Sequence, residues 1–463
     1  MTPDGLRLRV LGVAVEVAFE EGFAPELAAA LRRAWSRCLD VEEAVRPSAP
    51  RPPRFNGGPS DGGRSDGAPS DGGRSDGGPS ATHRAPSGPL RASVRTERGV
   101  ASIEGESPER FASELTSAVT LSAIEARAGE LLMLHAAALA DPATGRSAAL
   151  VGPSGMGKTT ATRVLGREWG YVTDETVALD RSGFLELYAK PLSVVASGSR
   201  RPKHQVGPDE AGLRVAPRAA TLGAVVLLDR RPEGDGSPDA AGDWPRVVPL
   251  SHAEALIELA PHTSSLARID RPLEWLCSTL DACGGAVRVE YRDALDLAAL
   301  LPALLDRAPL AREWASALHD GAVLDDGAAP SDGAVLDDPA VLDDPAVLDD
   351  GAVRDDGDRR LHDKGAWLNG GFVRRAEVVD AVSIPRDDGA EELLAMVGHH
   401  VIRLSGIGPL IWEALGTPLT LAGIAERIAP EVGLPDGYEA SLAAAVAELE
   451  AHGVVSRFGQ DGP

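Results

Sequence analysis

The residues from Gly152 to Thr159 match the pattern GxxxxGK[ST], which is typical of loops that bind nucleotide phosphates. Gly155 and Gly157 let the backbone approach phosphate oxygens without a side-chain clash. Lys158 is expected to reach the β- and γ-phosphates, and the Thr159 hydroxyl is expected to ligate Mg²⁺. The pattern therefore predicts that the chain binds a nucleoside triphosphate together with Mg²⁺.

The flanks of this loop have the character that phosphate binding requires. The apolar run from Ala148 to Val151 suits a buried strand, and Thr160 to Gly166 suit the start of a helix. A strand that turns through glycines into a helix N-terminus aims several backbone N–H groups and the positive end of the helix dipole at one point. The residues expected to contact the nucleotide are Gly152, Ser154, Gly155, Met156, Gly157, Lys158, Thr159 and Thr160.

A pair of acids, Asp174 and Glu175, ends a second short apolar run that begins at Gly170. In phosphate-transferring proteins, a carboxylate at the C-terminal end of a strand beside such a loop holds Mg²⁺ and positions the nucleophile. Adjacent acids can divide these roles, one as metal ligand and one as general base, although the pair would also suit a solvated turn. We expect Thr159, Asp174 and Glu175 to surround the metal.

Two other residues compete for roles in this region. Asp229 ends the apolar strand from Ala224 and is a second candidate metal ligand, although Arg230 and Arg231 follow it directly. His135 closes the apolar run from Leu131 and, taken alone, would suit a hydrogen-bonded histidine of the core.

The order His135, phosphate loop, Asp174-Glu175 resembles the catalytic domain of HPr kinase/phosphorylase, over roughly residues 120 to 300 and most strongly from 131 to 179. The resemblance implies an ATP-dependent kinase in which Asp174 is a base or metal-linked residue acting on a serine hydroxyl. It also implies that Glu175 helps to hold Mg²⁺ and that His135 supports the acid. The chain departs from the family in having Glu as the second acid and no clear equivalent of the C-terminal signature segment, so phosphorolysis is not carried over.

Basic residues follow the acid pair and could clamp phosphates or an acidic peptide, although a solvated charged loop fits them equally well. These candidates for a substrate clamp are Lys190, Arg200, Arg201 and Lys203. No HRD or DFG string indicates a eukaryotic-type protein kinase, and no NKxD string indicates guanine recognition. ATP is therefore the expected nucleotide.

The overall charge argues against a nucleic-acid partner. The chain of 463 residues has a net charge of −24, and half of it, −12, lies between Asp320 and Asp358. Nucleic-acid binding needs a basic surface that releases counterions. The three cysteines lack metal-ligand spacing, and no apolar run is long enough to span a membrane. No signal peptide is expected, because Glu16 breaks the apolar run from Leu11 to Phe19. We therefore expect a cytoplasmic protein.

Two repetitive tracts divide the chain into folded pieces. Residues 46–89 repeat Ser-Asp-Gly and predict a disordered linker, and residues 318–362 repeat Ala-Val-Leu-Asp-Asp with Gly or Pro and predict a second, acidic one. A hexapeptide period also suits a small β-helix or a Ca²⁺-binding repeat, against which the recurring prolines argue. Residues 1–45, with a strand over Leu6–Val17 and a helix over Ala24–Cys38, are expected to pack on the core formed by residues 90–317.

Residues 363–463 are expected to form a separate small domain of strands and helices. Strands are predicted over Val378–Ile384, His400–Leu404 and Val454–Phe458, and a helix over Gly406–Leu415. Thr420 is expected to cap a second helix, and Asp436 with Glu439 to form the capping box of a third. That last helix carries acids and no Lys or Arg, so a winged helix of this kind would repel DNA.

The run from His400 to Ser405, followed by Leu410 to Leu415, resembles the PqqD family of peptide-modification chaperones. The resemblance implies a winged-helix-like α+β domain that binds the leader of a ribosomally made precursor peptide as an added strand. An unspecific helical domain is the alternative. Other peptide-modification enzymes are further expected partners.

Taken together, the sequence predicts an α/β protein: a P-loop, HPr-kinase-like domain joined by disordered linkers to a PqqD-like domain. The expected function is phosphorylation of Ser or Thr in a peptide or protein, with ATP and Mg²⁺ as cofactors. A non-catalytic ATP-binding peptide scaffold and a kinase of a small metabolite are the alternatives.

Overall fold

The computed structural model describes residues 5–40, 89–195, 203–231, 244–318, 371–386, 389 and 391–459. Within these ranges the chain is a mixed α/β protein with several sheets. The two repetitive tracts, 46–89 and 318–362, fall outside the described residues except at their ends, so the predictions about them are not addressed. None of the helices in the described ranges combines the length and the apolar character that crossing a bilayer requires.

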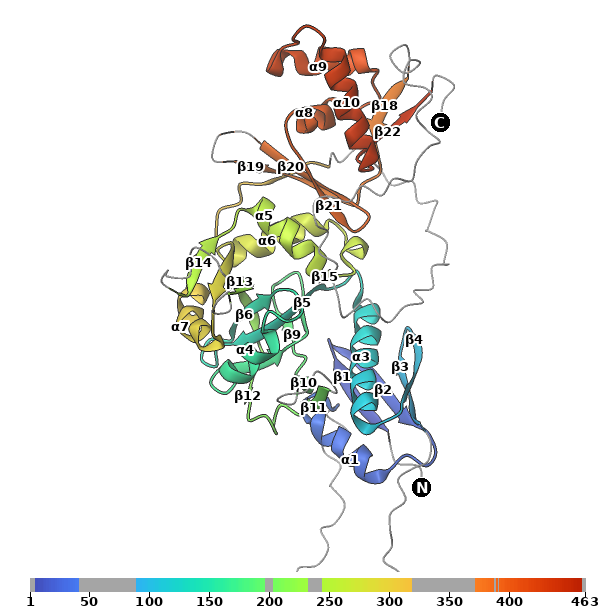
Figure 1. Cartoon of the computed structure of the whole chain (residues 1–463), viewed down its shortest axis with the longest axis vertical. Coiled ribbons are helices and arrows are strands. Elements are labelled where there is room, and N and C mark those ends of the chain that lie inside the picture. Colours follow the sequence, from blue (N-terminus) through green and yellow to red (C-terminus); the bar gives the residue numbers. More distant parts are fainter. Residues whose placement is uncertain are drawn as a thin grey trace, which may run out of the picture.

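The N-terminal part is a four-stranded antiparallel sheet covered by two helices (Figure 1). Its elements are β1 (Leu6–Val10), β2 (Val13–Phe19), β3 (Leu90–Thr96), β4 (Gly99–Gly105), α1 (Pro25–Ala34), η1 (Ser36–Cys38) and α3 (Pro108–Arg127). Buried and exposed residues alternate along β1 and β2, as expected when one face of a sheet is solvated. The strand predicted over Leu6–Val17 is instead a hairpin, because Leu11 and Gly12 have positive φ angles and turn the chain.

This sheet crosses the predicted boundary at residue 90. β2 pairs with β3 in the register Val17–Val94, so strands on either side of the first tract belong to one sheet. Its core extends into the larger sheet, because Phe111 of α3 belongs to the same buried cluster as Leu131, Met133 and Tyr188.

The centre of the molecule is a ten-stranded sheet in the order β12-β7-β5-β6-β13-β16-β14, with β8 and β15 also paired to β5, and β9 to β8. Its strands are β5 (Leu132–Ala140), β6 (Arg146–Val151), β7 (Gly170–Thr173), β8 (Thr176–Leu179), β9 (Leu185–Glu186), β12 (Arg214–Val215), β13 (Thr221–Arg230), β14 (Arg246–Pro249), β15 (Thr263–Ser264) and β16 (Ala286–Tyr291). β6, β13 and β16 are parallel, and β6 is almost wholly buried, as a strand covered on both faces must be. A separate hairpin joins β10 (Leu192–Val195) to β11 (Lys203–Val206).

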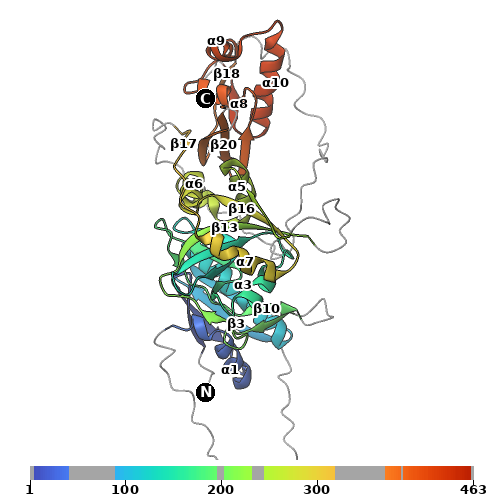
Figure 2. The ribbon, with the colours of Figure 1, turned by 90° about the vertical axis from the view of Figure 1, so that its left-hand side faces the viewer.

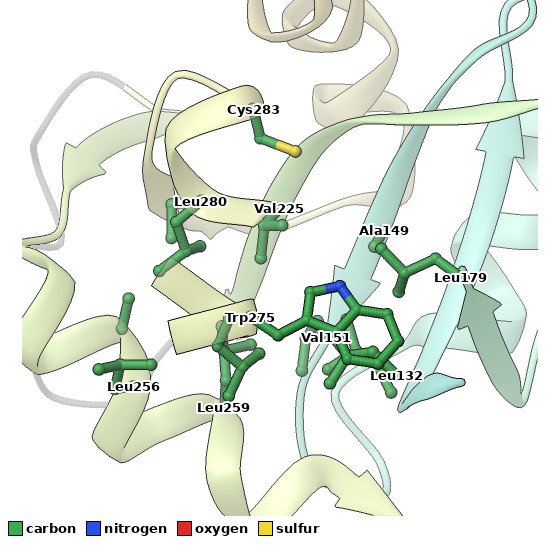
Figure 3. Close-up of a cluster of buried hydrophobic side chains, with 14 of the residues drawn as sticks. Leu132, Ala149, Val151, Leu179, Val225, Leu256, Leu259, Trp275, Leu280 and Cys283 are labelled. Carbon is green, nitrogen blue, oxygen red and sulfur yellow. The ribbon is translucent and has the colours of Figure 1, made fainter. Parts of the chain in front are cut away.

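Helices cover both faces of this sheet. They are α4 (Lys158–Leu165) and α7 (Ala294–Leu305) on one face, and α5 (His252–Leu259) and α6 (Pro272–Ala282), with the short turns η2 (Ala260–His262) and η3 (Leu266–Arg268), on the other. Because successive strand residues point to opposite faces, Leu150 packs with α4 and α7 whereas Val151 packs with α5 and α6. Figure 3 shows the Trp275 ring of α6 lying against Leu132 and Val151.

The C-terminal part, as far as it is described, combines a four-stranded sheet in the order β17-β19-β20-β21, a separate two-stranded sheet of β18 and β22, and three helices. Its elements are β17 (Ala315–Ser316), β18 (Phe372–Arg375), β19 (Asp380–Pro385), β20 (Glu391–Val397), β21 (His400–Leu404), α8 (Gly408–Ala414), α9 (Leu421–Val432), α10 (Tyr438–Ala451) and β22 (Val455–Phe458). The predicted strand over His400–Leu404 and the Thr420 cap, which accepts from the Gly423 N–H, are confirmed. The predicted Asp436–Glu439 capping box is wrong, because Gly437 adopts a positive φ and the helix starts one residue later without a side-chain cap.

The C-terminal sheet is docked on the central part of the molecule (Figures 1 and 2). One face of β19 and β20 packs with α8, α9 and α10, whereas the other, including Val382 and Leu394, shares a buried cluster with Leu256 of α5 and Leu273 of α6. β17, which directly follows the central part, pairs with β19 and extends this sheet across the predicted boundary at residue 317.

Asp380 fastens this junction. Its buried carboxylate accepts hydrogen bonds from the Leu273 and Glu274 N–H groups at the start of α6, at 2.7 and 3.1 Å, and from its neighbour Ala381 at 2.8 Å. Burial raises the pKa of Asp380 to about 6, so the group is largely ionised at neutral pH. A carboxylate at a helix N-terminus satisfies orphan N–H donors and interacts well with the helix dipole.

We expect Asp380→Ala to lower the free energy of unfolding by about 1–3 kcal/mol, because it leaves buried N–H groups without an acceptor. Urea denaturation followed by tryptophan fluorescence measures this change. Asp436→Ala is the matched control, since Asp436 is exposed and caps no helix. Equal stabilities of the two variants would contradict the role of Asp380.

Candidate functional site

The loop from Gly152 to Gly157 connects β6 to α4, at the end of β6 where parallel strands also end. Gly155 and Gly157 have φ angles of 89° and 93°, in the left-handed region that favours glycine. Gly157 is also closely surrounded, because a Cβ there would lie 2.9 Å from the Tyr291 hydroxyl, which itself donates to the Met156 carbonyl. The sequence of this loop is therefore matched to its backbone.

Lys158, the first residue of α4, folds back over this loop. Its buried ammonium donates to the Gly152 carbonyl and, at 3.3 Å, to the Pro153 carbonyl. Burial lowers the pKa of Lys158 to about 8, while Asp174 and Glu175 act in the opposite direction. The Lys158 ammonium therefore lies on the inner side of the loop, where it could pair with a bound phosphate. Of the other expected contacts, Ser154 and Thr160 are exposed and Met156 packs against the core below α4.

Thr159 and Asp174 are brought together from different elements. The Thr159 hydroxyl, in the first turn of α4, donates to Asp174 Oδ2 at 3.2 Å. Asp174 directly follows β7 and is buried, and its Oδ1 accepts from the Tyr171 hydroxyl at 3.1 Å. The predicted neighbourhood of Thr159 and the acid pair is thus present in the structure.

Asp174 and Glu175 share a buried cation, Lys190. The Lys190 ammonium lies 2.9 Å from Asp174 Oδ1 and 3.0 Å from Glu175 Oε2. The side chains of Lys190 and Asp174 are 3% and 2% exposed, whereas Glu175 is 26% exposed and reaches solvent. Burial opposes the charge on Lys190, yet the two carboxylates raise its pKa above the ordinary value. Lys190 is therefore a partner of the acids rather than the substrate clamp that the sequence suggested.

His135 lies at the edge of the same site. It is the one residue of β5 that is not fully buried, and it pairs in register with Thr176, the residue after the acids. Burial lowers the pKa of His135 to about 4, with Lys158, His262 and Lys190 adding to the effect and Asp174 opposing it. Burial and the nearby positive charges therefore favour the neutral form of the His135 imidazole.

His262 and Tyr171 are site residues that sequence reasoning missed. His262 ends η2, and because Thr263 pairs with Leu134, it lies opposite His135 in the β15–β5 register. Burial and then Lys158 lower the pKa of His262. Nothing local distinguishes His262 in the sequence, whereas Tyr171 stands in the run that ends in the acid pair and could have been noticed there.

The remaining candidates lie apart from this cluster or outside the described residues. Arg200 and Arg201 are outside them, and Lys203 begins β11 without a described side chain. Asp229 pairs with Arg231 at 2.7 Å, and within the described residues it forms no hydrogen bond with Thr159. The acid pair therefore fits the metal-ligand role better than Asp229 does.

The oxygen atoms of Thr159, Asp174 and Glu175 suit a hard cation that also binds oxygen atoms of a ligand. Thr159, Asp174 and Glu175 offer only oxygen atoms, as Mg²⁺ prefers, and Mg²⁺ usually completes its shell with waters and phosphate oxygens. Among the described residues no cluster of three or more His, Cys, Asp or Glu could hold a metal on its own. A nucleotide phosphate is therefore the natural partner of any cation held here.

Comparison with known proteins does not assign the chain to a family. The chain matches no model of a known protein family and no curated protein sequence. The residues and their geometry therefore carry the functional argument.

We expect Gly157→Ala to destabilise the protein more than Gly155→Ala, which adds only the backbone strain of about 1–2 kcal/mol because nothing lies within 4 Å of its Cβ. The extra cost at Gly157 comes from the collision with the Tyr291 hydroxyl. Chemical denaturation of the single variants and of Gly157→Ala/Tyr291→Phe measures it. Removing the hydroxyl should recover part of the loss in the double variant, and purely additive effects would contradict the packing described.

Proposed function

We propose that the chain is an ATP-dependent phosphotransferase, similar to HPr serine kinases, that phosphorylates Ser or Thr of a peptide. The observation that carries the proposal is the Thr159–Asp174 contact of 3.2 Å beside the Lys158 ammonium, at the N-terminus of α4. A strand, a glycine loop and a helix that place a hydroxyl, a carboxylate and a lysine together match the needs of phosphate binding in P-loop proteins.

The residues divide into groups that hold the nucleotide and groups that face the acceptor. The loop N–H groups and Lys158 would bind the phosphates, and Thr159 with Asp174 Oδ2 would hold Mg²⁺, which when bound supplies neutralising charge on the phosphates. Glu175 is more exposed than Asp174, and within the described residues its Oε1 accepts no hydrogen bond. We therefore assign Glu175 to accept the proton of the acceptor hydroxyl, whereas the family resemblance implies that Glu175 helps to hold Mg²⁺.

The C-terminal sheet supports a peptide as the substrate. β17 covers its edge at β19, while β21 forms the other edge and carries exposed and half-buried residues. An extended peptide could add to β21 as a further strand, the mode used by PqqD-like domains. α10 lies behind this sheet with Glu439 and Glu448 exposed and Glu450 paired to Arg457, so its surface does not favour nucleic acid.

The docking of this sheet places β21 near the proposed nucleotide site. β21 contacts α5 and η2, and η2 ends at His262, opposite His135 of the nucleotide site. A peptide held at β21 would therefore have a raised effective concentration near the acids. The three buried free thiols, Cys38, Cys277 and Cys283, fit the reducing cytoplasm where ATP is available.

The test incubates the protein with ATP, Mg²⁺ and any short peptide that is encoded beside its gene, and detects phosphopeptide by mass spectrometry. Lys158→Ala should lower the yield at least about 100-fold, because it removes the cation that faces the phosphates. Arg163→Ala, an exposed change on the same helix, should leave the yield unchanged. Absence of phosphopeptide with wild-type protein, or full activity of Lys158→Ala, would sink the kinase proposal.

The same assay, together with a measurement of ADP binding, separates a kinase from an ATP-binding peptide scaffold. In a kinase, Glu175→Gln should retain Mg²⁺-dependent ADP binding but lose transfer, whereas Asp174→Asn should weaken the binding itself. A scaffold would deliver peptide equally well with wild-type protein and Glu175→Gln, as long as nucleotide binds.

A further inference from the structure

Lys190 has no hydrogen-bonding capacity left for a substrate. An ammonium group offers three N–H donors. Those of Lys190 face Asp174 Oδ1 at 2.9 Å, Glu175 Oε2 at 3.0 Å and the Pro191 carbonyl at 3.1 Å. A phosphate oxygen could bind this ammonium only by displacing one of these partners.

The backbone of Lys190 is held on both sides as well. Its N–H donates to the Tyr188 carbonyl at 2.9 Å, and its carbonyl lies 3.1 Å from the Tyr171 hydroxyl, whose single proton it shares with Asp174 Oδ1. Tyr188 is itself fixed, because its hydroxyl lies 2.7 Å from that of Thr120 in α3. The ammonium is therefore a fixed point behind the acids and does not swing into the site.

Stability alone does not account for this arrangement. Burying an ion pair costs desolvation energy that its Coulomb attraction often fails to recover, and apolar replacements are frequently neutral. The pair of acids needs the cation only if both carboxylates must stay ionised and in place. That need arises from the chemistry proposed for Asp174 and Glu175.

On the basis of the proposed function, we propose that Lys190 is a positioning residue that fixes one oxygen of each acid and so aims the other two. Asp174 Oδ1 and Glu175 Oε2 are held at one nitrogen, 2.9 and 3.0 Å away. Asp174 Oδ2 is left beside the Thr159 hydroxyl for the cation, and Glu175 Oε1 is left for the acceptor hydroxyl. Lys190 thereby orients Asp174 toward the cation and Glu175 toward the acceptor hydroxyl.

The test compares the full-length wild-type protein, Lys190→Met and Lys190→Met/Glu175→Gln. Mn²⁺ bound in the presence of ADP is measured by electron paramagnetic resonance, and peptide phosphorylation is measured separately. Lys190→Met removes a positive charge from the acids, so Mn²⁺ should bind about tenfold more tightly. Turnover should nevertheless fall about 100-fold with little change in KM for ATP, because the freed acids lose their alignment. The double variant restores the charge balance and should bind Mn²⁺ like the wild type.

These results would be difficult to obtain from a merely structural residue, whose loss lowers metal binding and turnover together. Weaker Mn²⁺ binding by Lys190→Met, or transfer at the wild-type rate, overturns the assignment. If Lys190→Met does not fold, the double variant Lys190→Met/Glu175→Gln provides the test. A Mn²⁺ affinity like that of the wild type supports the assignment, and a loss of Mn²⁺ affinity overturns it. If the wild-type protein binds Mn²⁺ and ADP but phosphorylates no peptide, the kinase proposal fails separately. A raised Mn²⁺ affinity in Lys190→Met would still support the Lys190 contacts in that case, and an unchanged one would overturn them.

Discussion

Two carboxylates and one ammonium meet behind the 152–159 loop, and the two buried charges, Lys190 and Asp174, each require a partner because burial removes them from water. Lys190 neutralises part of the charge of Asp174 and Glu175, and Tyr171 and the Pro191 carbonyl complete the hydrogen bonds. Several surrounding elements pack around this cluster and hold its side chains in place. The N-terminal sheet and α3 close its rear, because Tyr188, two residues before Lys190, packs in their core. The N-terminal part thus packs against the segment that carries Lys190 and supports the site from behind.

The second organising feature is the firm docking of the C-terminal sheet. Its inner face shares a core with α5 and α6, Asp380 fastens the start of α6, and β17 closes one edge. The remaining edge, β21, lies by η2 and hence by His262. If a peptide is captured there, the path to Glu175 is set by packing rather than by the length of a linker. Capture and chemistry then belong to one rigid arrangement.

The sequence predicted the local order of strand, loop and helix around the candidate phosphate site. The loop glycines, Lys158 and Thr159 stand in one short run with a strand before and a helix after, and the structure has that order. The acid pair could be foreseen because it ends a strand. Lys190 could not be assigned correctly, since its partners lie 15 and 16 residues away in the chain and only the fold makes it buried. His262 was missed because strand pairing, not sequence, brings it to His135.

Other differences have similar origins. The two-residue strand β17 has no periodicity to detect, and its pairing with β19 depends on tertiary docking. The hairpin at Leu11–Gly12 and the start of α10 after Gly437 depend on left-handed backbone angles that the local patterns did not indicate.

A crystal structure of the full chain with Mg²⁺ and a non-hydrolysable ATP analogue tests the account most directly. It should show phosphates at the 152–159 loop, Mg²⁺ bound by Thr159 Oγ1 and Asp174 Oδ2, and Lys190 still joining the acids. Nucleotide bound elsewhere, or Mg²⁺ held by Asp229, would contradict it.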